Sequence, residues 1–128
     1  MLAGLKIRIL IANDHNIIRQ GLVRLLQGCK DLAVVGEAAG WQQTLELCRR
    51  VSPDVVIMDV NMPGITGSEP ISALKKEFPH IKIISLSAGE ELPQSAALRA
   101  EGAVACFSKS GCLDALVAAI RGCKAGAA

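Results

Sequence analysis

The chain has 128 residues, of which 51% are hydrophobic and only 2% aromatic. This length suits a single domain with a real core, and so apolar a composition excludes a disordered chain. No stretch free of Asp, Glu, Lys and Arg exceeds nine residues, which excludes a membrane-spanning helix. Lys6 and Arg8 precede any long apolar run, so no secretory signal is expected. A net charge of +2 and the lack of tyrosine argue against a surface for binding nucleic acid.

The cysteines indicate a reduced, cytoplasmic chain. They are odd in number and form no C-x-x-C pair, and Cys29 and Cys48 fall on apolar helix positions. We therefore expect cysteines that act as small hydrophobic residues. The cysteines lack the spacings of zinc ligands and the two histidines are isolated, which argues against a zinc site.

Strand-like and helix-like periodicities alternate along the chain. In chain order, the pattern predicts a strand over Lys6–Ala12, a helical stripe from Ile18 to Cys29, a strand over Leu32–Ala38, a helix from Trp41 that ends before Ser52, a strand over Asp54–Asp59, a helix over Ser68–Phe78, a strand over Ile81–Leu86, a helix over Pro93–Glu101, a strand over Val104–Phe107 and a helical stripe from Leu113 to Ile120. The third strand is a continuous apolar run, typical of a strand buried on both faces.

Five successive βα units predict an α/β fold with a parallel sheet and helices on both faces. No repeat or linker interrupts the pattern, so residues 1–128 are expected to form one domain. The tail Cys123–Ala128 lacks apolar periodicity. It is expected to fray, or to begin a linker to a further domain.

Polar side chains follow four of the predicted strands, where an open α/β sheet binds its ligands. Asp14 follows the first strand, Asp59 ends the third, Ser87 follows the fourth and Lys109 follows the fifth. Two carboxylates at one edge suit a divalent cation such as Mg²⁺. A carboxylate beside a metal is also a nucleophile for phosphorus, and the hydroxyl and ammonium groups suit a phosphoryl group.

Each of these residues also has a purely structural interpretation. Asp14 could cap the helix that starts near His15, and Asp59 could be a turn or cap residue. Ser87 could be a turn serine and Lys109 a solvated lysine. The four together favour a site, because turn residues need not provide the required chemical groups at four separate strand ends.

Nearly the whole chain resembles the receiver domain of two-component response regulators. The matching segments are Ile9–His15, Pro53–Gly67, Ile84–Ala88 and Gly102–Ser110. The most specific motif is Asp59 followed by x-x-Met-Pro-Gly-x-x-Gly. The run from Asp14 and His15 through Arg19 to Gly21 and Leu22 is most similar to receivers with a LuxR-type helix-turn-helix output.

The resemblance implies a flavodoxin-like fold with strand order 2-1-3-4-5 and assigns roles by position. Asp59 would accept a phosphoryl group from a histidine kinase. Mg²⁺ would be bound by the side chains of Asp14 and Asp59 and by the backbone carbonyl of Asn61. Ser87 would be the switch hydroxyl and Lys109 the pairing lysine.

The resemblance also implies the partners of the domain. The last strand and the fourth and fifth helices would form the output face, with a homodimer possible through the last helices. DNA would be bound only through a domain outside this chain, and the whole protein would control transcription. The only catalysis expected is that of the domain's own phosphorylation and dephosphorylation.

Two positions depart from the family pattern. Asn13 stands where the family has the first acid of a pair, so the site loses one negative charge and Mg²⁺ binding is expected to weaken. Cys106 stands where the family has an aromatic switch residue. Phe107 is adjacent, but neighbouring strand residues point to opposite faces of a sheet. The usual aromatic signal is therefore not expected.

These departures leave a second function open, a degenerate receiver that binds partners independently of phosphorylation. Two enzyme classes fit less well. Hydrolases with an aspartate nucleophile usually have an acid two residues later, where this chain has Asn61. A flavodoxin-like electron carrier would need a phosphate cradle after the first strand, and Asp14 would repel a flavin phosphate.

Overall fold

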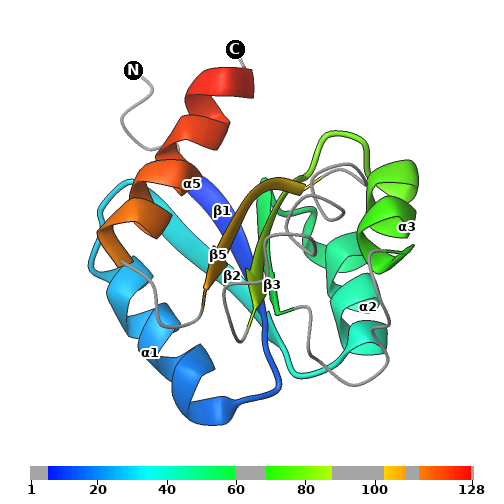
Figure 1. The fold of residues 1–128 in the computed structure, drawn as a ribbon, viewed down its shortest axis with the longest axis horizontal. Helices are drawn as coiled ribbons and strands as arrows, with labels where there is room; N and C mark the ends of the chain where they lie inside the picture. Colours follow the sequence, from blue (N-terminus) through cyan, green and yellow to red (C-terminus); the bar gives the residue numbers. More distant parts are fainter. Residues whose placement is uncertain (1–5, 60–68, 88–102, 109–112, 128) are drawn as a thin grey trace.

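Five segments rich in aliphatic residues pair into one parallel sheet (Figure 1). A computed structural model of the chain describes residues 6–59, 69–87, 103–108 and 113–127. The strands are β1 (Ile7–Ala12), β2 (Leu32–Ala38), β3 (Val55–Asp59), β4 (Lys82–Ser87) and β5 (Ala103–Ser108). Their order is β2-β1-β3-β4-β5, which confirms the predicted doubly wound fold.

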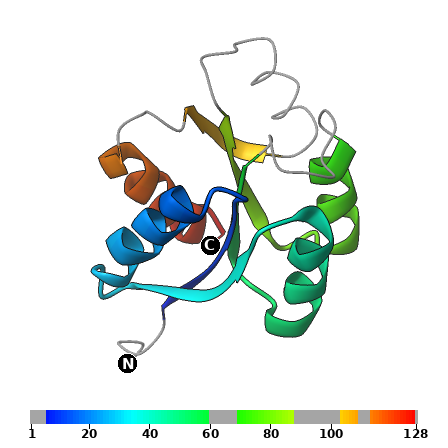
Figure 2. The same cartoon turned by 90° about the horizontal axis from the view of Figure 1, so that it is seen from below.

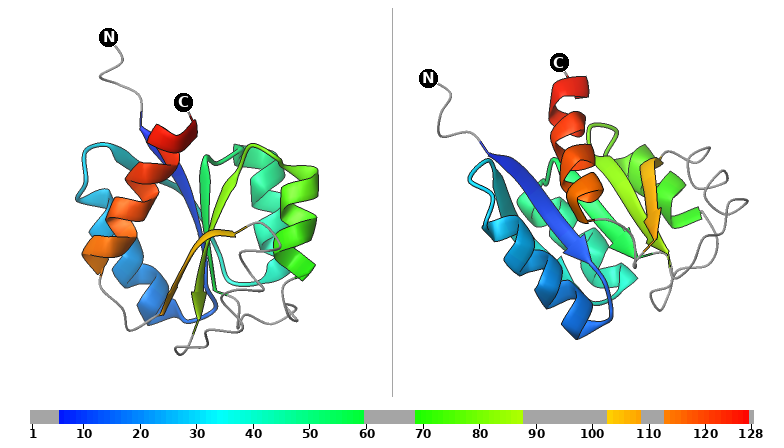
Figure 3. Two further views of the ribbon diagram at one scale, coloured as in Figure 1. Left: turned by 45° about the horizontal axis from the view of Figure 1, so that its top comes forward. Right: turned by 60° about the vertical axis from the view of Figure 1, so that its left-hand side comes forward.

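Helices cover both faces of the sheet. The described helices are α1 (Asn16–Gln27), α2 (Trp41–Val51), α3 (Glu69–Glu77) and α5 (Leu113–Ala127). The helices α1 and α5 lie on one face and α2 and α3 on the other, and Figures 2 and 3 show the same layers from other sides. The helix predicted over Pro93–Glu101 lies outside the described residues. None of the described helices combines the length and hydrophobicity needed to span a bilayer.

Two predictions need correction, the end of the first helical stripe at Cys29 and the fraying of the tail from Cys123. The helix α1 ends at Gln27, with Gly28 as its C-cap, so Cys29 lies just beyond it. The helix α5 continues to Ala127, so the prediction that the chain frays from Cys123 is wrong. Cys123 itself packs against the core, and the alanines that follow favour a helix without needing an apolar face.

Alternate residues of the central strands enter two separate hydrophobic cores, as the pleat of a strand requires. The core beneath α1 and α5 includes Ile9, Ile11, Val55, Ile57, Leu26 and Ile120. The core beneath α2 and α3 includes Leu10, Val56, Met58, Cys48, Leu74 and Ile83. All residues of β3 are buried, which confirms the prediction of a strand covered on both faces.

The three cysteines whose side chains the structure describes serve as small hydrophobic groups, as predicted. Cys29, Cys48 and Cys123 are free thiols. Cys48, a residue of α2, is fully buried in the core between α2, α3 and the sheet. Burial, with a smaller contribution from Glu77, raises the pKa of the Cys48 thiol to about 11. Cys48 therefore stays protonated and inert near neutral pH.

A bulge interrupts the pairing of β2 with β1. Ile9 pairs with Val34, but Leu10 pairs with Gly36, so Val35 is an extra residue. Beyond the bulge, Gly36 lies close to Leu10, and a Cβ at this glycine would lie 2.9 Å from Cδ1 of Leu10. The bulge also reverses the facing of Glu37, which the simple alternation of Leu32–Ala38 would have directed toward α2.

The packing of α1 gives a direct test of the core. Leu26 is 0% exposed and Ile17, on the same helix, is 86% exposed. Leu26→Ala should lower the free energy of unfolding by about 2–5 kcal/mol because it leaves a cavity. Ile17→Ala should change it by less than about 0.5 kcal/mol. Urea denaturation measures both, and similar losses in the two variants would contradict the described orientation of α1.

Candidate functional site

The candidate site lies at the carboxyl ends of β1 and β3. Ala12 pairs with Met58, so the residues that follow them, Asn13 and Asp59, leave neighbouring strands at the same level. Both side chains are 0% exposed, although an amide and a carboxylate are costly to bury. The parallel register of the two strands therefore brings polar groups together beneath the edge of the sheet.

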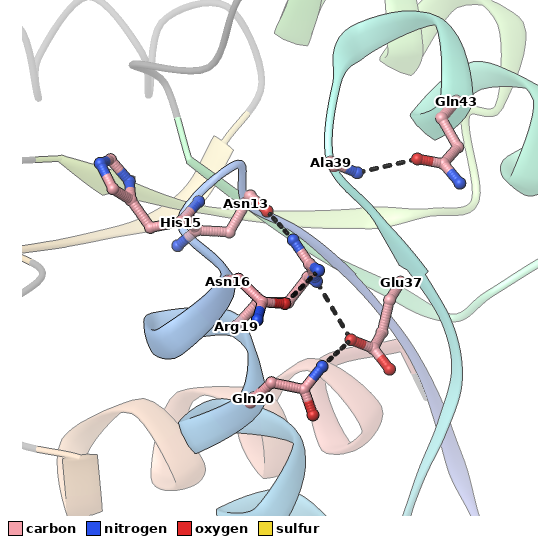
Figure 4. A network of polar contacts seen from close by, with 8 residues as sticks. All are labelled: Asn13, His15, Asn16, Arg19, Gln20, Glu37, Ala39 and Gln43. Carbon is pink, nitrogen blue, oxygen red and sulfur yellow. Dashed lines mark hydrogen bonds and ion pairs between the residues drawn. The ribbon is translucent and has the colours of Figure 1, made fainter.

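The backbone turns sharply at Asn13, between β1 and α1 (Figure 4). Its backbone N–H donates to the carbonyl of Ala38 in β2 (2.9 Å), and its side-chain Oδ1 accepts a hydrogen bond from the backbone N–H of His15 (2.8 Å). The helix α1 begins at Asn16 with His15 as its N-cap residue, and no side chain caps it. Asp14 is thus not the helix cap, which removes its main structural alternative.

The turn brings Asp14 and His15 next to Asp59. Nδ1 of His15 lies 3.3 Å from Oδ1 of Asp14 and 3.8 Å from Oδ2 of Asp59. One ligand atom from each of the three side chains lies within 4.8 Å of the others. The side chain of Asp59 is fully buried, that of Asp14 is 28% exposed and that of His15 is 56% exposed. The group is therefore buried at Asp59 and open to solvent at His15.

This group has the chemistry of a divalent-cation site. Two carboxylates so close together favour a cation between them. Oδ1 of Asp14 is a buried oxygen without a hydrogen-bond partner in the described part of the chain. Carboxylate oxygens suit Mg²⁺, whereas the nitrogen of His15 also suits transition metals. The residues present thus fit a divalent metal ion.

The contribution of His15 was missed from the sequence. His15 was expected only as a residue at the start of a helix, and that placement is confirmed. Its imidazole, however, contacts both carboxylates of the site. The available signal was its position directly after Asp14, but the turn that directs the imidazole toward Asp59 depends on Asn13.

The other predicted site residues are described in part or not at all. Ser87 is the last residue of β4 and pairs with Ser108 of β5 at the same edge of the sheet. Cys106 pairs with Ser85, two positions back from that edge. Asn61 and Lys109 lie outside the described residues. The structure therefore brings Asp14 and Asp59 together and sets the strand positions of Ser87 and Cys106.

The chain is similar to known signalling proteins. The family model described as response regulator receiver domain matches residues 9–121. The response regulator GacA of Pseudomonas viridiflava is 39% identical over 115 residues, which are 90% of this chain and 54% of GacA. The chain thus spans about half the length of such curated relatives.

Solved structures show the same fold. A LuxR-family two-component response regulator from an Aurantimonas species has a TM-score of 0.88 and 30% identity, with 94% of this chain and 86% of that chain covered. RcsB from Salmonella enterica serovar Typhimurium, bound to a promoter in the presence of a phosphomimetic beryllium fluoride, has a TM-score of 0.84 and 25% identity. This match covers 91% of this chain and 66% of that one.

The missing charge at Asn13 can be restored. Asn13→Asp should tighten Mg²⁺ binding about fivefold, because one extra negative charge adds attraction on the order of 1 kcal/mol. Asp retains the oxygen that accepts from His15, so the turn should persist. Calorimetric titration with MgCl₂ measures the affinity.

Asn16→Asp is the matched control for this change. It adds the same charge at an exposed residue three positions along the chain. It should tighten Mg²⁺ binding less than Asn13→Asp does, since an exposed charge is screened by solvent. Equal gains in the two variants, or no gain at position 13, would contradict a role of that position in metal affinity.

Proposed function

The chain belongs to the response regulator receiver domain family, and on that premise we propose that Asp59 accepts a phosphoryl group from a histidine kinase. The observation that carries the proposal is the cluster of Asp14, His15 and Asp59. A fully buried carboxylate ends the central strand β3, with a second carboxylate and an imidazole within 4.8 Å. Such a concentration of like charge is poorly suited to a merely structural role.

The proposed step is a phosphoryl transfer. One carboxylate oxygen of Asp59 forms a bond to phosphorus while the bond from phosphorus to the donor nitrogen breaks. The electron pair of that bond stays on the donor imidazole, and Asp59 becomes an acyl phosphate. Burial of Asp59 on a rigid strand orients the attacking oxygen, and orientation is a large part of such catalysis.

Asp14 and Asp59 would hold Mg²⁺ through their side chains, and Asn61 through its backbone carbonyl. When bound, Mg²⁺ would neutralise negative charge on the oxygens of the phosphoryl group. Ser87 would donate a hydrogen bond to a phosphoryl oxygen, and Lys109 would pair with its charge. The end of β4 at the edge of the sheet supports the assignment of Ser87.

The whole protein would act in transcription. The chain is about half as long as GacA, and RcsB binds a promoter through a longer chain. We infer that residues 1–128 are the receiver domain of a longer regulator that binds DNA through another domain. Transcription control would put that protein in the cytoplasm. Phosphorylation would shift the population between two conformations that present different surfaces. One of these surfaces would form a homodimer through the last helices.

A receiver that binds partners independently of phosphorylation is the second candidate. Asn13 favours it, since the buried amide replaces a charge and its Nδ2 has no hydrogen-bond partner among the residues described. Cys106 favours it as well, because the side chain is too small to report phosphorylation as a ring does. Asp14 and Asp59, both retained, favour the phosphoacceptor.

Phosphorylation can be tested by intact mass. With phosphoramidate and Mg²⁺, the wild-type chain should gain one phosphoryl group, and Asp59→Asn should gain none because an amide oxygen is a poor nucleophile. Asp54→Asn is the matched control. Asp54 directly precedes β3, at the end of the strand opposite Asp59. An amide oxygen at this position can still accept from the backbone N–H of Arg8. Labelling of Asp59→Asn, or no labelling of the wild type, would contradict the proposal.

The output can be tested by light scattering on the labelled chain. If phosphorylation shifts the population toward a dimer, the apparent molar mass should rise with the labelled fraction, and Asp59→Asn should remain at the unlabelled value. Full labelling with no change in molar mass or in amide hydrogen exchange of α5 would instead favour the phosphorylation-independent module.

A further inference from the structure

One arginine of α1 joins three parts of the chain beside the candidate site. Nη1 of Arg19 donates to the backbone carbonyl of Asn13 (2.7 Å), Nη2 to Oδ1 of Asn16 (2.8 Å) and Nε to Oε1 of Glu37 (3.1 Å). Figure 4 shows these contacts as dashed lines that converge on one guanidinium group. The side chain of Arg19 is only 15% exposed, and its hydrogen bonds to Asn13 and Glu37 are partly buried, whereas the one to Asn16 is exposed.

The contact with Asn13 matters because Asn13 directly precedes Asp14. Three hydrogen bonds fix Asn13. Its backbone N–H donates to the carbonyl of Ala38, its Oδ1 accepts from the backbone N–H of His15, and its backbone carbonyl accepts from Nη1 of Arg19. The first belongs to the sheet and the second to the turn, so among the described hydrogen bonds of Asn13 the one from Arg19 links it to the body of α1. The direction in which Asp14 leaves the sheet therefore depends on this guanidinium.

The bulge in β2 supplies the partner that holds Arg19. If β2 paired regularly through Val35, Glu37 would pair with Ala12, one position later along β1, and would point toward α2. With the bulge, Glu37 pairs with Ile11 and points toward α1, where it accepts from both Arg19 and Gln20. A bulge that re-aims one side chain beside a functional site is a recurrent structural device.

We propose that Arg19 is a positioning residue that acts through the carbonyl of Asn13 to hold Asp14 against Asp59 for metal binding. This inference rests on the proposed function, since it assigns Arg19 to the same metal-dependent site. It does not make Arg19 a catalytic residue, because its guanidinium contacts neither carboxylate of the site in any described interaction.

The geometry requires a guanidinium at this position. Arg19 reaches three acceptors on a helix, a turn and a strand at once through three different nitrogens. The flat, rigid fork of arginine is suited to this, whereas lysine presents a single nitrogen on a flexible stem. Arg19→Lys therefore keeps the charge but loses the arrangement.

The test compares four variants of this chain. Arg19→Met removes the whole guanidinium, and Arg19→Lys removes its geometry only. Glu37→Gln weakens the hold on Arg19 but keeps an acceptor oxygen, so it should fold even if Arg19→Met does not. Gln20→Met is the matched control, because Gln20 is the next residue and donates to the same oxygen of Glu37 (3.2 Å) without reaching Asn13.

Two measurements are made on each variant. The first, without metal, is hydrogen exchange of the His15 backbone amide, which is bonded to Asn13 Oδ1. The second is the dissociation constant for Mg²⁺ by calorimetry. Thermal unfolding of each variant corrects the exchange rates for any change in global stability.

We expect Arg19→Met and Arg19→Lys to speed exchange of the His15 amide about tenfold and to weaken Mg²⁺ binding about tenfold, as loss of an outer-shell contact typically does. Glu37→Gln should change both in the same direction by less, and Gln20→Met should leave both at the wild-type value.

Equal effects of Arg19→Met and Gln20→Met would overturn the proposal, because Arg19 would then only brace the helix. Wild-type values in Arg19→Lys would overturn the claim that geometry matters. If the wild-type chain binds no Mg²⁺, the proposed metal-dependent function fails. The exchange of the His15 amide, measured without metal, still decides whether Arg19 holds the turn.

Discussion

The constraint on which the site depends is the parallel register of β1 and β3. This register sets the end of one strand beside the end of the other, and the polar residues that follow have to share one buried edge. The result is two carboxylates, Asp14 and Asp59, in a space where like charges repel. The repulsion persists only because the surrounding elements fix both backbones, and that fixed proximity is what a cation or a phosphoryl group can use.

The aliphatic cores on both faces of the sheet provide that rigidity. Every residue of β3 is buried, and each face of the strand packs against a different pair of helices. Asp59 thus stands at the end of a strand that cannot rotate without exposing one core or the other. The scarcity of aromatic residues costs the fold little, because isoleucine, leucine and valine fill both layers.

Much of this was predictable from local patterns. Strand-like and helix-like periods set the element order, and the acid at the end of an apolar run predicted Asp59 at the sheet edge. The bulge at Val35 was not predicted, although Gly36 within a strand pattern is a known signal of one. Without the bulge, alternation places Glu37 on the wrong face. The link between Arg19 and Glu37 joins residues 18 positions apart through a shift of register, which no helical or strand period contains.

Asn13 illustrates why shape and charge separate at this site. The turn after β1 needs an oxygen at position 13 to accept from the N–H of His15, and asparagine and aspartate both supply it. The fold therefore tolerates the amide, and Asp14 still lies beside Asp59. What the amide cannot supply is the charge, since its second terminal atom is a buried N–H₂ donor where an acid would have an oxygen. In the proposed metal site, the consequence of Asn13 would thus fall on the affinity for the cation and not on the architecture. The hydrogen bonds around the turn, including the one from Arg19 to the carbonyl of Asn13, are present with the amide in place.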